Sequence, residues 1–130
     1  MIVVNNKEEL RELINQRIEE QGPNCDLNDI DVSKITDMSY LFFLSPFNGD
    51  ISKWNVSKVE KMRQMFQYSK FNGDISNWNV SRVEDMSGMF FGSKFNGDIS
   101  RWDTFRVENM FSMFIGSPLY GKEPNWYWYK

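Results

Sequence analysis

Hydrophobic and polar positions follow one pattern that occurs three times in the middle of the chain. The segment Phe-Asn-Gly-Asp-Ile-Ser starts at residues 47, 71 and 95, so the period is 24 residues. Each copy continues with a Trp, a Val-Glu pair and a closing Met-x-x-Met-Phe. A fixed period between about 20 and 50 residues is typical of solenoids and other repeat arrays. The pattern therefore predicts a stack of one small unit.

A fainter copy of the same pattern precedes these three. It begins at Pro23, and its residues 32–35 (Val-Ser-Lys-Ile) match residues 56–59 (Val-Ser-Lys-Val) of the next copy. The predicted stack therefore has four coils of 24 residues, which occupy residues 23–118.

Within each coil the sequence predicts one short parallel strand and one short helix. The Asn-Gly pair marks a tight turn, because both residues tolerate positive φ. Asp-Ile-Ser-x-Trp has a β-branched centre and fits one strand of a parallel sheet. In residues 59–66 the apolar side chains are spaced by three and four, which fits one or two helical turns. The predicted fold class is therefore an α/β solenoid.

Both ends of the stack are predicted to be covered. Residues 1–22 contain a β-branched run that fits an edge strand and then an amphipathic helix over 6–21, with Asn6 as N-cap and Glu9 completing a capping box. An open solenoid end exposes apolar core, so we interpret this segment as a cap; an independent helix with its own partner is the alternative. Residues 119–130 form either an aromatic C-terminal cap or a partial fifth repeat, since Trp126 keeps the repeat register.

The repeated motif resembles the BspA-like bacterial surface-protein repeat, a family of repeats of about 25 residues that is common in mycoplasma lipoproteins and in gut and oral bacteria. The resemblance covers roughly residues 23–118. It implies a relative of leucine-rich-repeat solenoids that is used for adhesion or protein binding and has no catalytic residues. Two features depart from the family. The start of the chain has no signal peptide or lipid-anchor cysteine, and residues 103–105 break the motif.

Charge and composition narrow the class of partner. The net charge of −3 and the pI near 5.0 argue against general affinity for nucleic acid or anionic membranes. No run of roughly 18 apolar residues exists, so no membrane span is expected. The N-terminus lacks the features of a signal peptide, which predicts a cytoplasmic protein as written and leaves a surface location open if a signal was removed. A single cysteine, Cys25, excludes an internal disulfide.

Catalytic residues, metals and cofactors are not expected. The chain has no His, so Cys25 has no imidazole to activate it. One carboxylate recurs in every coil, in a column formed by Asp26, Asp50, Asp74 and Asp98. These side chains either bind calcium between coils or accept backbone N–H bonds within their turns, and we favour the second role.

Three other recurring columns are also assigned to the stack itself. The basic column Lys34, Lys58, Arg82, Arg106 runs beside the acidic column Glu60, Glu84, Glu108. We predict a solvated ion-pair ladder between them rather than a grip on an acidic partner. For Trp54, Trp78 and Trp102 we favour a place in the core over a sugar-binding platform.

Function is expected where the repeat is not kept, because positions needed for stacking recur. Three such columns are Ser39, Arg63, Ser87, Phe111; Tyr40, Gln64, Gly88, Ser112; and Phe43, Gln67, Phe91, Ile115. The predicted partner-binding residues are Arg63, Gln67, Phe91, Phe105, Phe111, Trp126 and Trp128. Exposed together, such aromatics form the kind of patch that marks an interface. Arg63, in the basic repeat 47–70, would add electrostatic steering.

The sequence thus predicts a capped, leucine-rich-repeat-like α/β solenoid that works as a non-catalytic protein-protein interaction module. One alternative is a phage- or host-encoded inhibitor that occludes an intracellular enzyme. Others are a surface adhesin or a self-assembling structural repeat, with a possible end-to-end homodimer formed through the weakly capped C-terminal coil.

Overall fold

The computed structural model describes residues 1–128, so residues 129–130 of the predicted C-terminal cap lie outside the described residues. It contains a strand β1 at Ile2–Val3, a helix α1 at Lys7–Gln21 and a strand β2 at Ile30–Asp31. β1 and β2 pair in parallel, with Ile2 opposite Ile30.

Helix α1 begins and ends as its local sequence requires. The side chain of the N-cap Asn6 accepts a hydrogen bond from the N–H of Glu9 at 2.9 Å, and the N–H of Gly22 donates to the carbonyl of Ile18 at 2.8 Å. An N-cap oxygen of this kind satisfies one of the free donors of the first helical turn. Leu10 and Ile14 are buried, so the apolar side of α1 packs on the rest of the chain.

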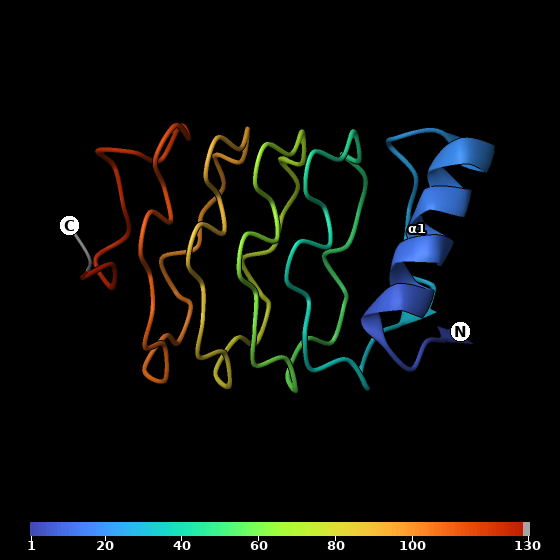
Figure 1. The fold of residues 1–130 in the computed structure, drawn as a ribbon, viewed down its shortest axis with the longest axis horizontal. Coiled ribbons are helices and arrows are strands. Elements are labelled where there is room, and N and C mark those ends of the chain that lie inside the picture. The colour runs from blue at the N-terminus through green and yellow to red at the C-terminus, as the bar shows by residue number, and fades with distance from the viewer. Residues whose placement is uncertain (129–130) are drawn as a thin grey trace.

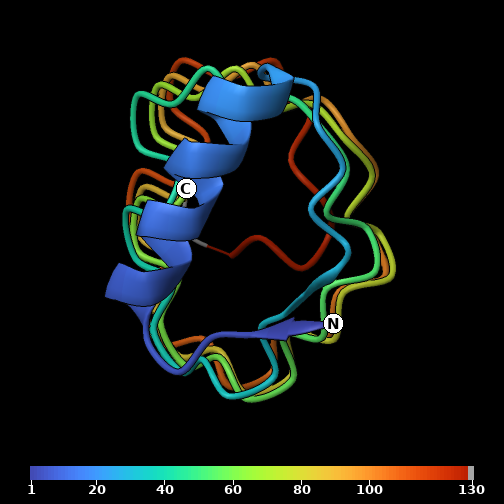
Figure 2. The same cartoon turned by 90° about the vertical axis from the view of Figure 1, so that its right-hand side faces the viewer.

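After α1, successive 24-residue repeats lie side by side, with α1 at one end and the C-terminus at the other (Figure 1). Viewed from the α1 end, their outlines nearly superimpose, and the C-terminal segment crosses the far end (Figure 2). Parallel bridges link equivalent positions of neighbouring repeats: Asp26 with Asp50, Asp37 with Lys61, Lys61 with Asp85, and Asp85 with Asn109. We number the repeats from one to four, as residues 23–46, 47–70, 71–94 and 95–118.

The second half of each repeat is a run of turns, which we call the turn ladder (residues 38–45, 62–69, 86–93 and 110–117). In the second repeat, the N–H groups of Met62, Gln64, Phe66 and Tyr68 donate to carbonyls of the third repeat at 2.8–2.9 Å. Between them, the N–H groups of Met65 and Gln67 close local turns by donating to the carbonyls of Met62 and Gln64. Alternate donors thus serve the neighbouring repeat and the local turn.

The short helix expected in residues 59–66 is replaced by this turn ladder. An α-helix would direct each N–H to the carbonyl four residues earlier, whereas four of the eight N–H groups in residues 62–69 donate to the next repeat. Consecutive turns also place every third or fourth side chain inward, which explains the helix-like apolar spacing. The expected strand around Asp50 is likewise reduced to a single bridge, because the Asp50 carboxylate and the Ile51 carbonyl take local N–H bonds instead.

Identical side chains stack on one another to form a continuous core. Phe42, Phe66, Phe90 and Phe114 stack with ring centroids 5.4–5.8 Å apart. Each stacked Trp donates its Nε1–H to the carbonyl 27 residues earlier, as Trp78 does to Ile51 at 3.0 Å. The predicted core role of the Trp column is therefore confirmed, since Trp54, Trp78 and Trp102 are buried. Trp126 makes the same bond to Ile99 at 2.8 Å and stacks on Trp102, so the last segment continues the register beyond the fourth repeat.

Candidate interaction surface

The outward side of the turn ladder contains backbone that favours glycine. Two equivalent positions in each repeat have positive φ: Tyr40, Leu44, Gln64, Tyr68, Gly88, Gly92, Ser112 and Gly116. The left-handed region costs a non-glycine residue roughly 1–2 kcal/mol. The third repeat avoids this cost with two glycines, whereas the first two repeats place large side chains there. Stability alone therefore does not explain Tyr40, Leu44 and Tyr68.

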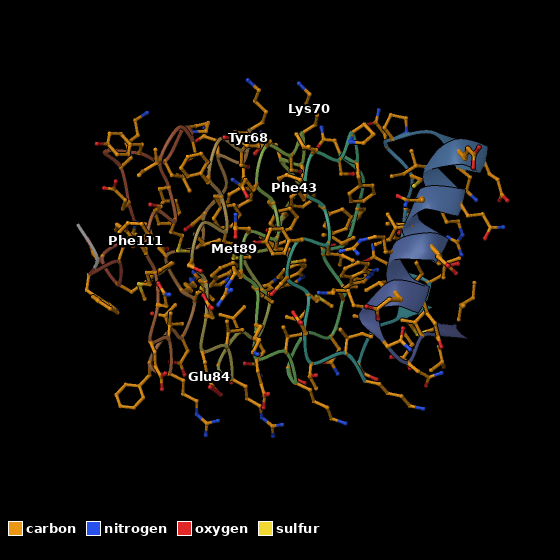
Figure 3. The ribbon with its side chains drawn as sticks, viewed as in Figure 1. Phe43, Tyr68, Lys70, Glu84, Met89 and Phe111 are labelled. Atoms are coloured by element: carbon orange, nitrogen blue, oxygen red, sulfur yellow. The ribbon has the colours of Figure 1, made fainter. Side chains whose placement is uncertain are left out.

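Four aromatic side chains form a line across the first three repeats, which we call the aromatic ridge (Tyr40, Phe43, Tyr68 and Phe91). Ring centroids are 5.9 Å apart for Tyr40 and Phe43, 6.4 Å for Phe43 and Tyr68, and 5.7 Å for Tyr68 and Phe91. Tyr40, Phe43 and Tyr68 are exposed. Figure 3 shows Phe43 and Tyr68 near one another and Phe111 closer to the C-terminal end.

Gly92 supplies the space in which the Tyr68 ring lies. A Cβ atom at Gly92 would come within 2.4 Å of Cδ1 of Tyr68. Contacts that short do not occur, so the Tyr68 ring rests directly against the backbone of the third repeat. The glycine and the tyrosine are therefore matched, and together they fix the orientation of an exposed aromatic ring.

Polar groups beside the ridge are bonded to one another. The Tyr40 hydroxyl donates to the side-chain oxygen of Gln64, and Gln64 Nε2 donates to the side-chain oxygen of Gln67. The predicted site residue Gln67 thus lies beside the ridge, in the same column as Phe43 and Phe91.

Arg63 is held in place by an ion pair. Its Nε and Nη2 both donate to Oδ2 of Asp85, at 3.1 and 2.9 Å. Burial by itself raises the pKa of Asp85, but the N–H and hydroxyl of Ser87 and the Arg63 guanidinium outweigh it, so this pKa lies below its usual value. The guanidinium is half-exposed and carries a fixed positive charge on this surface.

A cleft of about 440 Å³ lies at the C-terminal end. Its apolar lining comes from Phe111, Phe114, Ile115, Tyr120 and Tyr127. Glu123 is the charged residue of this lining, and one of its carboxylate oxygens accepts the N–H of Gly121 at 2.8 Å.

The structure does not bring all seven predicted partner-binding residues together. Phe91 belongs to the ridge, Gln67 is linked to Tyr40 through Gln64, and the carbonyl of Arg63 accepts the N–H of Tyr40 at 3.0 Å. Phe111 lines the C-terminal cleft, whereas Phe105 does not and is 95% exposed on the corner of its own repeat. Trp126 is half-buried and packs against the core, and Trp128 is exposed at the end of the described chain.

Sequence analysis missed two members of this surface, Leu44 and Tyr68. Both belong to the non-recurring column Leu44, Tyr68, Gly92, Gly116. The available signal was a tyrosine in a column that contains two glycines. Glycine at one position of a repeat indicates backbone that favours glycine. A large side chain at the equivalent position of another repeat therefore indicates a role other than stability.

The charged columns have structural roles that differ in part from those predicted. Asp50, Asp74 and Asp98 each accept the N–H of the residue two positions later at 2.9 Å, and Asp26 does so at 2.8 Å, which confirms the turn-acceptor role. The ion-pair ladder is wrong: within residues 1–128 no ion pair joins the basic and acidic columns. These side chains lie on exposed corners, where solvation competes with pairing. The described part of the chain also shows no cluster of His, Cys, Asp or Glu suited to a metal ion.

Comparison with known proteins identifies a family. A family model described as "Mycoplasma protein of unknown function, DUF285" matches residues 9–126. Curated proteins and solved structures give no significant match. Among the described residues, no helix is long and apolar enough to span a membrane.

Proposed function

Because the chain belongs to the Mycoplasma family DUF285, whose description assigns no function, we propose a function from the surface itself. The protein is a non-catalytic protein-binding module, built as a leucine-rich-repeat-like α/β solenoid related to the BspA-like surface repeats. Its partner is a protein that contacts the aromatic ridge, with Arg63 and Gln67 at the side of the contact.

The observation that supports this proposal most strongly is the position of Tyr40 and Tyr68. Both occupy left-handed backbone at which glycine would be less strained, and both are exposed. Strained residues that persist in a fold are a pointer to function. Tyrosine is also enriched at protein interfaces, since a rigid ring offers a large contact area and a polar tip.

The ridge has the features of a protein-binding surface rather than of a small-molecule site. It is a row of side chains that spans three repeats, and its hydroxyl and amide groups are already ordered by mutual hydrogen bonds. Side chains that are ordered before binding lose less conformational entropy when the partner binds.

The test is capture of partners by the intact chain and by two variants. We expect one or more proteins from the source cells to bind the intact chain and the control Phe105→Ser, but not the double variant Phe43→Ser/Tyr68→Gly. The control removes an exposed aromatic outside the ridge, so it accounts for nonspecific adhesion. Circular dichroism and thermal melting establish that all three proteins are folded. Equal capture by all three would contradict the role of the ridge, and conversion of a substrate by the chain alone would contradict a non-catalytic module.

A further inference from the structure

The C-terminal end of the turn ladder presents a row of backbone donors. In the third repeat, the N–H groups of Met86, Gly88, Phe90 and Gly92 donate to carbonyls of the fourth repeat at 2.8–3.0 Å. The equivalent groups of the fourth repeat, which we call the donor row, belong to Met110, Ser112, Phe114 and Gly116. Within residues 1–128 no acceptor is bonded to any of them. The row continues the pairing pattern of the stack, but among the described residues it meets no further repeat.

Part of the donor row is shielded from water and part is accessible. Met110 and Phe114 are 0% and 1% exposed, so their N–H groups gain little from solvent. Gly116 is exposed and Ser112 is half-buried. An N–H group without an acceptor gains a hydrogen bond from an incoming carbonyl where that carbonyl can reach it. The accessible donors at Ser112 and Gly116 offer the first contacts.

The apolar cleft lies directly beside this row. Ser112 and Phe114 contribute to both, and Ile115 and Tyr120 are exposed on the rim of the cleft. Backbone donors give affinity for any chain, while a neighbouring cleft selects the side chain that accompanies it. The two features together describe a site for a polypeptide rather than for a small molecule.

We propose that this end binds a segment of a partner protein that adopts the conformation of the repeat. Its carbonyl groups face the accessible donors at Ser112 and Gly116, and a bulky apolar side chain enters the cleft. The first three repeats support this choice, because each of their donor rows receives a segment of this kind, with the sequence Met-x-x-Met-Phe. The site is separate from the aromatic ridge, and the proposal does not depend on binding there.

A second copy of this chain does not suit the donor row. Two C-terminal ends placed together would oppose donors to donors. The complementary carbonyl edge, in the first repeat, belongs by register to Asp37, Ser39, Leu41 and Phe43, and it lies at the end of the stack where α1 packs and Leu10 is buried. The two ends are at opposite extremes of the stack (Figure 1). These contacts favour a different protein over the end-to-end homodimer.

The probe is the segment that already pairs with a donor row in this fold, residues 59–70. In the second repeat its carbonyls at Lys61, Arg63, Met65 and Gln67 accept from the first repeat. A copy of residues 59–70 is fused to the C-terminus of the full chain through a flexible Gly/Ser linker, which holds it at an effective concentration of roughly millimolar. The matched control carries a scrambled copy on the same linker.

Amide hydrogen exchange, followed by NMR, then reports on each donor separately. We expect the amides of Ser112 and Gly116 to exchange at least about tenfold more slowly with the fused segment than with the scrambled one. The substitutions Ile115→Ser and Tyr120→Ser in the cleft should abolish this protection, whereas Phe105→Ser should preserve it. Unchanged exchange at both amides, or equal protection by the scrambled segment, would overturn the proposal. The ridge variant Phe43→Ser/Tyr68→Gly should retain the protection, which separates this test from that of the ridge.

Discussion

Phe66 and Tyr68 are two residues apart in the same turn ladder and have opposite roles. Phe66 is fully buried between Phe42 and Phe90, and the same residue recurs in every repeat. Tyr68 is 47% exposed on strained backbone, and the next two repeats have glycine in its place. A residue type that recurs at the same position of every repeat is therefore one that stacking requires. A bulky residue at a position where other repeats have glycine is one that stacking does not require.

The largest expected effect on stability comes from a substitution at a buried position that recurs in every repeat. Phe66→Ala should lower the free energy of unfolding by about 3–5 kcal/mol, because it leaves a cavity between two stacked rings. Urea or guanidinium denaturation measures this. Phe105→Ala is the matched control, and since that ring is exposed, its effect should stay within about 0.5 kcal/mol. Similar values for the two variants would contradict the assignment of Phe66 to a close-packed core.

A smaller effect on stability is expected at Gly92, against which the Tyr68 ring lies. Gly92→Ala should destabilise the protein by more than about 1–2 kcal/mol, because it adds a contact with the Tyr68 ring to the backbone cost of positive φ. Gly121→Ala is the matched control, since Gly121 also has positive φ but nothing lies within 4 Å of its Cβ position. The difference between the two denaturation midpoints isolates the displacement of Tyr68. Equal midpoints would mean that the ring is not held against Gly92.

Acid should weaken the recurring turns in a predictable pH range. The Asn28 side chain, followed by the hydroxyl and N–H of Ser52, lowers the pKa of Asp50 to about 2. An unfolded Asp titrates near 3.9, so this contribution is complete above about pH 4 and is lost as the pH falls toward about 2. We expect urea midpoints to decrease over that range, and Asp50→Asn to reduce the decrease. A pH dependence that Asp50→Asn leaves unchanged would show that this carboxylate is not coupled to folding.

The smallest effect on stability is expected from a substitution of Tyr68, which does not recur in the other repeats. Tyr68→Gly relieves positive φ but loses contacts with Phe43 and Phe91, and glycine also gains entropy in the unfolded state. These effects offset, so the free energy of unfolding should change by less than about 1 kcal/mol. Thermal melting measures the stability, and the capture experiment measures the expected loss of binding. A large loss of stability would place Tyr68 among the residues needed for stacking.

Sequence analysis succeeded where a feature depends on local bonds or on identical neighbours. Asn6 and Glu9 indicated the start of α1 because an N-cap acts within one helical turn. The Trp column was assigned to the core because identical side chains at one spacing stack in identical surroundings. The C-terminal segment was left between a cap and a partial repeat, and Trp126 shows features of both, since it keeps the register and covers Trp102.

Sequence analysis failed where a feature depends on distant partners. The inward spacing of residues 59–66 fits a helix and a turn ladder equally well, because both place every third or fourth side chain on one side. The ion-pair ladder was inferred from columns alone, which do not reveal that corner side chains extend into solvent. The two glycines in the column of Leu44 and Tyr68 indicate backbone that favours glycine, but the left-handed angles themselves are set by the fold.

By itself, the sequence determined the 24-residue period, the inward-facing set and the helical cap. These follow from side-chain chemistry repeated at one spacing and from short-range capping. Only the tertiary structure decided where the backbone donors go, since the acceptor of the Met62 N–H is in the next repeat, at Asp85. Among residues 1–128, the same pairing leaves the donors of the fourth repeat without acceptors, and the fold places the Tyr68 ring against Gly92. A hydrogen bond between repeats is a property of two segments, and neither segment alone specifies it.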